Sequence, residues 1–454
     1  MMAGEFLEKK IFRVYMLMRK SFYIIFCLLS SVSFAEDMQL AKASHIENTS
    51  PSFFTTSENA SNFKKLETRL RSYPKDYEAD LLKAILYFKS GKLDLALEEI
   101  DKLIKKVPDF QLAYLLKGDL LLSKFTDTND LGQTTLLASI VSQLDNNKKI
   151  QLNFLREEAQ LRVRALLKKK KTKVLPRQIL ALGESVKKAL LIDKSANRLY
   201  VYTRQESGAL AEDINDYYIT TGKLVGDKVA KGDLRTPEGV YFVTSWISPS
   251  KLPDKYGVGA FPVNYPNELD KRNGKTGYGI WLHGTDKGSY SRPPRDSEGC
   301  VVLTNIDLSA LKSEIKPGVT PVVITNNVEW VDSTAWQQER NEIFQALESW
   351  RSDWESMNVN KYLSHYGKNF WSSTHNLKSW SARKRLLAKN KTYQSVSLSN
   401  LSVLVYPKDV EDEKQIAVVR LQQSYKSNNF KSEMYKRLYL TKNDNSWKIL
   451  YEGR

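Results

Sequence analysis

Cysteine and histidine are scarce in this chain of 454 residues, with two and four copies respectively. Two cysteines cannot build the disulfide framework of a small secreted scaffold, and they cannot supply a Cys-rich zinc site. Long apolar runs are also lacking, since the run at residues 21–34 is too short for an ordinary transmembrane helix. The four histidines are scattered through the sequence, so we predict neither a metal site nor a cofactor. They are His45, His283, His365 and His375.

Residues 1–35 have the pattern of an export signal peptide. Basic residues up to Lys20 precede the apolar run, and Ser33-Phe34-Ala35 places small residues where cleavage before Glu36 requires them. Cleavage would release a periplasmic or cell-envelope protein, and the alternative is a retained membrane anchor. The polar, Ser/Thr/Asn-rich stretch at residues 36–61 is predicted to be a disordered tether.

Removal of the signal leaves a single thiol. Cys27 leaves with the signal, so the mature chain carries Cys300 alone, although exported proteins normally use cysteine in pairs. Cys300 follows His283 by seventeen residues. An imidazole beside a thiol can take its proton and hold the resulting ion pair. The alternative is a small buried free cysteine, but a solitary exported thiol favours a reactive role.

Charge points to an anionic partner. The formal net charge is +17, from 69 basic and 52 acidic residues. Such a balance attracts polyanions. Inside a cell it would suggest nucleic acid, whereas after export the polyanions are wall peptides with free carboxylates and lipid head groups. Export therefore argues against nucleic acid, and simple solubility is the alternative explanation.

The pattern predicts a multidomain α+β protein. Residues 62–185 are predicted to be helical, because Pro74 recurs as Pro108 with matching neighbours and Gly91 marks a turn between paired helices. The offset between the two prolines is typical of tetratricopeptide-like helix pairs. Further helices are expected near residues 134–144 and 150–170. This region is either a groove for a protein partner or a helical spacer.

The central domain, residues 186–327, is predicted to be mostly β. Segments 189–192 and 198–202 read as a hairpin, with further strands at 217–221, 240–246, 280–283 and 321–325 and a helix at 305–313. Residues 333–454 begin with a helix at 334–357, a second helix containing Tyr362, Leu363 and Tyr366, and a third at 379–388. Four alternating strands follow, at 393–405, 415–425, 432–441 and 447–451, which predicts an α+β cone.

The central domain resembles the catalytic domain of the L,D-transpeptidase (YkuD-like) family. That family has a His, a spacer, a Ser/Thr-His-Gly-Cys box and then an Asn. The matching positions here are His283, Ser297, Gly299, Cys300 and Asn305. The stretches LLIDKSANRLYVY and KGDLRTPEGVYFV also match. Two positions depart from the pattern, since Glu298 replaces the His of the box and Val302 replaces the Arg two places after the Cys.

A Ser-Glu-Gly-Cys branch of the family resembles this chain, and it includes enzymes that trim wall peptides or cut peptidoglycan–lipoprotein links. The order of domains is also similar to the cell-shape-determining L,D-carboxypeptidases of helical bacteria, which end in an NTF2-like domain. The stretch WRSDWESMNVNKYLSHYGKNF resembles the first helices of such domains.

The resemblance implies roles for individual residues. Cys300 is the expected nucleophile, His283 the general base and acid, and Gly284 the residue whose carbonyl orients His283. N–H groups near Gly299 and Cys300 are expected to form the oxyanion hole. Further residues are expected to bind the stem peptide or line its cleft: Arg295, Arg292, Ser297, Trp281 and Tyr290. Local pairing of Arg295 with Asp296 or Glu298, and a core position for Trp281, are the alternatives.

Three functions follow from these expectations. The first is a peptidoglycan L,D-transpeptidase that attacks the L-centre of the diamino acid through a Cys acyl-enzyme. The second is an L,D-carboxypeptidase that trims tetrapeptide to tripeptide stems. The third is a non-catalytic wall-binding scaffold, which an intact His283, Gly299 and Cys300 disfavour. Stem peptides are the expected partner in all three.

Overall fold

The computed structural model of the chain describes residues 56–124, 145–168, 174–213, 216–407, 415–443 and 446–453. These belong to one compact unit, Phe53–Arg454. The predicted signal peptide, most of the predicted tether and the helix expected at residues 134–144 lie outside the described residues. Within that part of the chain, no helix has the length and apolar character needed to cross a bilayer.

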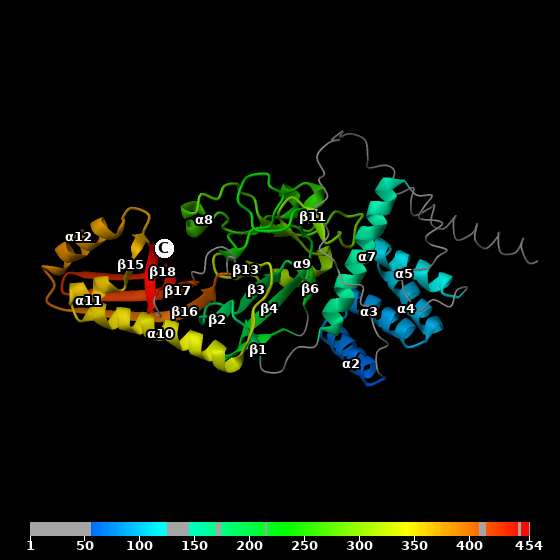
Figure 1. Cartoon of the computed structure of the whole chain (residues 1–454), viewed down its shortest axis with the longest axis horizontal. Coiled ribbons are helices and arrows are strands. Elements are labelled where there is room, and N and C mark those ends of the chain that lie inside the picture. The colour runs from blue at the N-terminus through cyan, green and yellow to red at the C-terminus, as the bar shows by residue number, and fades with distance from the viewer. Residues whose placement is uncertain are drawn as a thin grey trace, which may run out of the picture. The chain divides into compact units, whose positions relative to one another are not determined.

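The N-terminal region is a stack of antiparallel helices (Figure 1). They are α2 (Thr56–Ser72), α3 (Tyr77–Lys89), α4 (Leu93–Lys106), α5 (Gln111–Leu122) and α7 (Asn146–Leu167). The starts of α3 and α5 are separated by the predicted repeat. Asp76 caps α3 by accepting a hydrogen bond from the Ala79 N–H, and Gly91 takes the positive φ of the turn before α4.

The predicted boundary between the disordered tether and the first helix lies too far along the chain. Residues 56–61 are the first turns of α2 and not a disordered segment. The apolar residues that follow explain the helix, because Leu66 is fully buried and Phe63 packs against the same helical core. Burial of this stripe stabilises the polar first turns, although their composition alone favours disorder.

The central domain is built on a sheet with strand order β5-β4-β3-β13-β8, and β6 pairs with β4. Its strands are β3 (Lys188–Asp193), β4 (Arg198–Arg204), β5 (Leu210–Glu212), β6 (Tyr217–Tyr218), β8 (Gly239–Phe242) and β13 (Pro321–Thr325). The predicted hairpin is β3 and β4, paired from Lys188↔Thr203 to Asp193↔Arg198. Apolar side chains from β3, β4 and β13 fill the core beneath the site.

A second, smaller sheet of the central domain carries the candidate site. It contains β9 (Ala260–Pro262), β10 (Trp281–His283) and β12 (Val301–Val302) in the order β12-β10-β9. Beside it, β7 (Thr221–Gly222) pairs with β11 (Arg295–Ser297). Short helices complete the domain: α8 (Glu268–Arg272), α9 (Asn305–Lys312) and the 3-10 turns η2 (Pro249–Lys251) and η3 (Asp254–Tyr256).

The C-terminal domain is a curved sheet with the long helix α10 packed along it (Figure 1). Its helices are α10 (Ser333–Glu355), α11 (Val359–Ser364) and α12 (Leu377–Ala388). The sheet order is β15-β19-β18-β17-β16-β2. The strands are β15 (Tyr366–Trp371), β16 (Gln394–Val405), β17 (Ile416–Ser427), β18 (Phe430–Asn443) and β19 (Ser446–Gly453). Tyr366, expected in a helix, instead begins β15.

The predicted helical region also ends too late, because residues 174–181 form strands. These are β1 (Val174–Pro176), which pairs with β14 (Trp330–Asp332), and β2 (Ile179–Ala181), which pairs with β16. Ile179 and Leu180 are fully buried. Contacts with strands that come much later in the sequence, and not local propensity, therefore make this segment extended.

Candidate active site

The two predicted reactive residues lie on the same face of the β12-β10-β9 sheet. In the parallel pair β10–β12, Leu282 is opposite Val301 and His283 is opposite Val302. Cys300 directly precedes Val301, which places it across from Trp281. Because side chains alternate along a strand, Trp281, His283 and Cys300 project from one face. The nucleophile candidate and the base candidate are therefore diagonal neighbours.

His283 is held as a neutral base. Its Nδ1 lies 2.6 Å from the carbonyl oxygen of Gly284, so Nδ1 carries the proton and Nε2 has a free lone pair. The ring is only 4% exposed and meets Tyr256 edge to face at 4.9 Å. Burial lowers the pKa of His283 to about 4, and the cations of Arg292 and Lys255 act in the same direction.

Cys300 is held as a neutral thiol. The side chain is partly exposed, and Sγ lies 3.4 Å from the Gly279 carbonyl oxygen, to which the thiol donates. Burial raises the pKa of Cys300, whereas the Trp281 N–H and the Lys255 and Arg292 cations partly oppose this. The pKa shifts of both residues favour a neutral thiol and a neutral imidazole at rest, and not the ion pair that an imidazole can form with a thiol.

The turn before Cys300 is fixed by Ser297. Its Oγ donates to the Cys300 carbonyl oxygen at 2.6 Å and accepts from the Gly299 N–H at 3.1 Å. The Gly299 N–H is therefore already occupied, which corrects its assignment to the oxyanion hole. The Cys300 N–H has no hydrogen-bond acceptor among the residues that the structure describes, so it is the donor available there.

A glycine is required at position 299 by the backbone conformation and by the little space around its Cα. Its φ is +123°, and a Cβ would lie 2.7 Å from the carbonyl oxygen of Arg235. An L side chain at this position would be strained and would also meet the backbone of the neighbouring segment. Gly299 thus allows the turn that presents Cys300.

Asn305 locks the loop that orients His283. Its Nδ2 donates to the Thr285 carbonyl at 2.7 Å, and its Oδ1 accepts from the Val258 N–H at 3.1 Å. A Cβ on Gly284 would lie 2.1 Å from that Oδ1. The glycine therefore lets Asn305 approach and fix the carbonyl that holds the imidazole.

Two cations lie near the thiol and the imidazole. Arg292 donates to the Lys255 carbonyl at 3.0 Å and to Thr285 Oγ1 at 3.3 Å, and it pairs with Asp286 at 3.6 Å. Lys255 carries the second positive charge. Together they make the local potential positive, which suits a carboxylate-bearing ligand.

Trp281 and Tyr256 form an aromatic wall beside His283, with ring centroids 4.9 Å apart. Trp281 was predicted, but the sequence interpretation missed Lys255 and Tyr256. Both belong to η3, and the only local signal was their position just before Gly257-Val258-Gly259.

Two predicted cleft residues lie elsewhere. Tyr290 is 7% exposed and packs on Phe110 of the helical region, with centroids 4.3 Å apart. Arg295 pairs with Glu157 of α7 at 2.8 Å, not with Asp296 or Glu298. Both side chains are occupied by the helical region, so we correct their assignment to substrate binding. Glu298 is exposed.

Within the described ranges, no group of three or more His, Cys, Asp or Glu residues is arranged to hold a metal ion. His283 is the histidine of the site, and its Nδ1 is engaged by the backbone. The groups that the site offers for chemistry are the Cys300 thiol and the His283 base.

Comparison with known families matches two parts of the chain. Residues 187–324 match the L,D-transpeptidase catalytic domain (YkuD), and residues 342–453 match the Cds6 C-terminal NTF2-like domain. These matches agree with the predicted central and C-terminal domains. Neither includes the helical region.

Solved structures match a large part of the chain. Bd1075 of Bdellovibrio bacteriovorus is 33% identical, with 62% of this chain and 97% of that chain covered and a TM-score of 0.54. The helical cell shape determining protein Pgp2 of Campylobacter jejuni is 26% identical, with 60% and 94% covered and a TM-score of 0.51. No curated protein matches the chain.

Proposed function

The chain belongs to the family that joins an L,D-transpeptidase catalytic domain to a C-terminal NTF2-like domain, and on this premise we propose that it is a cysteine acyltransferase acting on peptidoglycan stem peptides. The observation that carries the proposal is the β10–β12 register, which projects His283 and Cys300 from one face. The proposed site of action is the cell envelope, reached by export of the mature chain.

In the first step, His283 Nε2 takes the thiol proton as Cys300 Sγ attacks the carbonyl carbon at the L-centre of the stem's diamino acid. The Cys300 N–H stabilises the oxyanion, a contribution typically worth a few kcal/mol per donor. The C–N bond to the terminal D-residue breaks, and its amine leaves with the proton from His283. A neutral imidazole at rest suits this role, because only that form accepts the proton.

In the second step, we propose water as the acyl acceptor. His283 takes a proton from water, hydroxide attacks the thioester, and the C–S bond breaks as Cys300 regains its proton. Support comes from Val302, which is 3% exposed and fills the position where the family pattern has an arginine. Similarity to a protein that determines helical cell shape also favours trimming.

Arg292 and Lys255 are proposed to bind the carboxylate of the stem peptide, since both cations already act on His283 and Cys300. Trp281 would contact the peptide chain, whereas Ser297 would act only through the turn that it fixes. A stem peptide with a free carboxylate is thus the proposed partner of the site.

The test is mass analysis of tetrapeptide muropeptides after incubation with the purified full chain. Tripeptide products are expected. Dimers linked between two L-centres would show that an amine is the acceptor, which is the transpeptidase alternative. Cys300→Ala should abolish turnover while keeping the unfolding temperature.

Labelling distinguishes an enzyme from a scaffold. A carbapenem should acylate Cys300 in the wild type and leave Cys300→Ala unmodified. Absence of both labelling and turnover in a folded wild-type protein would refute the enzyme and leave the wall-binding scaffold.

A further inference from the structure

We propose that the N-terminal helical region is a working part of the active site, because it holds the segment Tyr290–Arg295 and thereby positions Arg292. This segment lies between the base and the nucleophile in the chain. The predicted effect on catalysis rests on the proposed function. The contacts between the helical region and the segment Tyr290–Arg295 do not depend on it.

The first contact is an aromatic socket. The Tyr290 ring inserts between Phe110, at 4.3 Å, and Tyr77, at 6.2 Å, both from the helical region. Its backbone N–H donates to the Asp109 carbonyl at 3.4 Å. Tyr290 is only 7% exposed and belongs to the hydrophobic core cluster of the helical region, so burial of its large ring stabilises this contact. One loop residue thus anchors the segment firmly.

The second contact is polar and comes from α7. Ser291 Oγ donates to Glu158 Oε1 at 2.8 Å, and Arg295 pairs with Glu157 at 2.8 Å. Glu158 is itself held by Arg162 at 2.7 Å, and both side chains are 1% exposed. Consecutive acidic residues of one helix thus hold both ends of a short segment.

A third connection reaches Arg292 itself. The Arg162 guanidinium stacks on the Tyr218 ring at 3.8 Å, and the Tyr218 hydroxyl donates to the Arg292 carbonyl at 3.1 Å. Thr220 Oγ1 shares its proton between the same carbonyl, at 2.9 Å, and the Pro293 carbonyl, at 2.8 Å. The backbone of Arg292 is therefore fixed by two donors, while its guanidinium lies beside Thr285 and Lys255.

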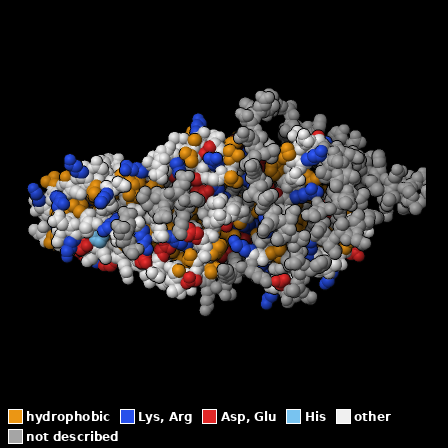
Figure 2. Space-filling model, viewed as in Figure 1, with side chains coloured by type: hydrophobic (Ala, Val, Ile, Leu, Met, Phe, Trp, Pro, Cys, Tyr) orange, Lys and Arg blue, Asp and Glu red, His pale blue; other side chains and the backbone are white. Residues whose placement is uncertain are grey.

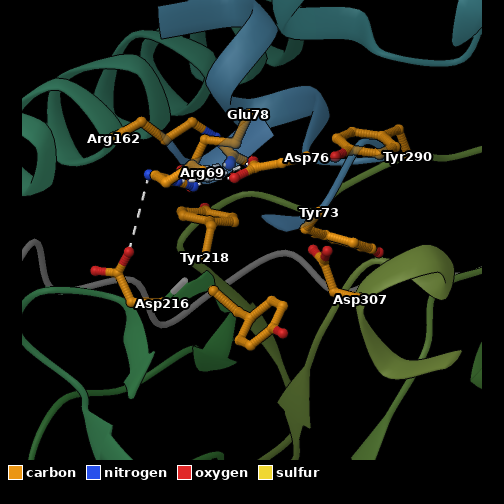
Figure 3. Close-up of a pocket in the computed structure, with 10 residues that line it drawn as sticks. Arg69, Tyr73, Asp76, Glu78, Arg162, Asp216, Tyr218, Tyr290 and Asp307 are labelled. Atoms are coloured by element: carbon orange, nitrogen blue, oxygen red, sulfur yellow. Dashed lines mark hydrogen bonds and ion pairs between the residues drawn. The ribbon is translucent and has the colours of Figure 1, made fainter. Parts of the chain in front are cut away.

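Buried ion pairs anchor the helical region to the catalytic domain, and Figure 3 shows the part of this network formed by Glu78, Arg69 and Arg162. Glu78 of α3 accepts from Arg162 at 2.8 Å and from Arg198 of β4 at 2.7 Å. Arg69 joins them at 2.9 Å. All of these side chains are at most 7% exposed. Separating the helical region from the catalytic domain would leave buried charges without partners, which is strongly unfavourable. The ion pairs therefore fix the position of the aromatic socket relative to the catalytic sheet.

Because the matched catalytic domain begins at residue 187, this support comes from a part of the chain outside it. The helical region is then a positioning element for substrate binding. It acts through Arg292, so its loss should weaken affinity for a carboxylate-bearing stem more than it slows the chemical step.

The test compares two double variants of the full chain. Tyr290→Ala/Ser291→Ala removes the socket ring and the hydroxyl, whereas Tyr290→Phe/Ser291→Thr keeps both contacts. With tetrapeptide muropeptide as substrate, the first should raise KM at least fivefold with kcat changed less than twofold, and the second should match the wild type. An unchanged KM, or a fall in kcat alone, would overturn the proposal.

Hydrogen–deuterium exchange provides a readout that needs no turnover. Amides of residues 288–297 should exchange faster in the Ala/Ala variant than in the wild type or the Phe/Thr variant. If the wild type processes no stem peptide, the proposed function fails, and exchange alone then decides whether the helical region holds the segment. Equal exchange in all three proteins would refute it.

Discussion

The imidazole of His283 determines how the activity should respond to acid. Its pKa is lowered to about 4 because the ring is buried, so the neutral form that accepts a proton persists well below the ordinary value near 6.5. We predict that the acid limb of kcat/KM against pH has its midpoint near 4 and not near 6.5. A pH–rate profile on tetrapeptide muropeptide measures it, and a midpoint at 6.5 would contradict the buried neutral base.

Gly299 offers a sharper test of the turn geometry. Gly299→Ala places a Cβ 2.7 Å from the Arg235 carbonyl at a φ of +123°, which should cost about 2–4 kcal/mol of stability. Turnover should fall by more than the folded fraction, because Cys300 follows directly. Thermal unfolding and active-site labelling measure the two effects. Gly274→Ala is the control, since no atom lies within 4 Å of its Cβ at a φ of +73°; equal losses in both variants would show that backbone strain alone matters.

A substitution of Asn305 tests how the loop orients the His283 base. Asn305→Ala would leave the Thr285 carbonyl and the Val258 N–H without their partner, at about 1–3 kcal/mol. Freed from Asn305, the loop would hold the Gly284 carbonyl less firmly, so kcat should fall with KM nearly unchanged. Steady-state kinetics at pH 7 measures it, and an effect confined to KM would contradict this role.

At the scale of elements, α9 carries a carboxyl group whose titration couples the helical region to the catalytic domain. Burial raises the pKa of Asp307 to about 7, and Asp76 and Glu78 across the contact add to the shift. The folded state therefore keeps a proton that the unfolded state releases near pH 4, so stability is lost as pH rises from about 4 to 7. The loss can reach about 4 kcal/mol.

Asp307→Asn should remove that loss. We expect the variant to unfold at a higher temperature than the wild type at pH 8 and at nearly the same temperature at pH 4. Asp101→Asn, which removes a partly exposed ion pair of α4, is the matched control and should change little at either pH. The same difference between Asp307→Asn and wild type at both pH values would show that Asp307 does not titrate in this range.

Elements with local signals could be predicted from the sequence. The hairpin of β3 and β4 surrounds a turn-forming segment, and the offset between Pro74 and Pro108 matches the spacing between the starts of α3 and α5. Elements made by distant contacts could not be predicted. The strand β2 is very short and finds its partner near Val403, and Tyr290 looks like a loop residue until Phe110 is brought beside it. The candidate pair of Cys300 and His283 could be proposed from the sequence because the two residues are close along the chain.

At the scale of the whole molecule, the relevant property is the net positive charge, and one face shows how part of it is distributed. Figure 2 shows basic side chains scattered over the C-terminal domain and not gathered into one stripe. With a formal charge of +17, the Cys300→Ala protein should bind isolated sacculi less as NaCl rises from 0.1 to 1 M, where the screening length shrinks from about 10 Å to about 3 Å. A pull-down with sacculi measures the bound fraction at each salt concentration. Sacculi with amidated carboxylates should bind less at low salt, and salt-independent binding would contradict an electrostatic contribution.

The pairing of β2 with β16 means that the C-terminal sheet is assembled from two pieces of chain, one on each side of the catalytic domain. In topological terms, the catalytic domain is an insertion within its neighbour. A fragment starting at Ser333 would carry β16 as a bare edge strand, ready to pair with another copy. During synthesis, Ile179–Ala181 must wait until the whole catalytic domain and then β16 have emerged before it finds its partner, so the catalytic domain is synthesised in full before the C-terminal sheet can be completed.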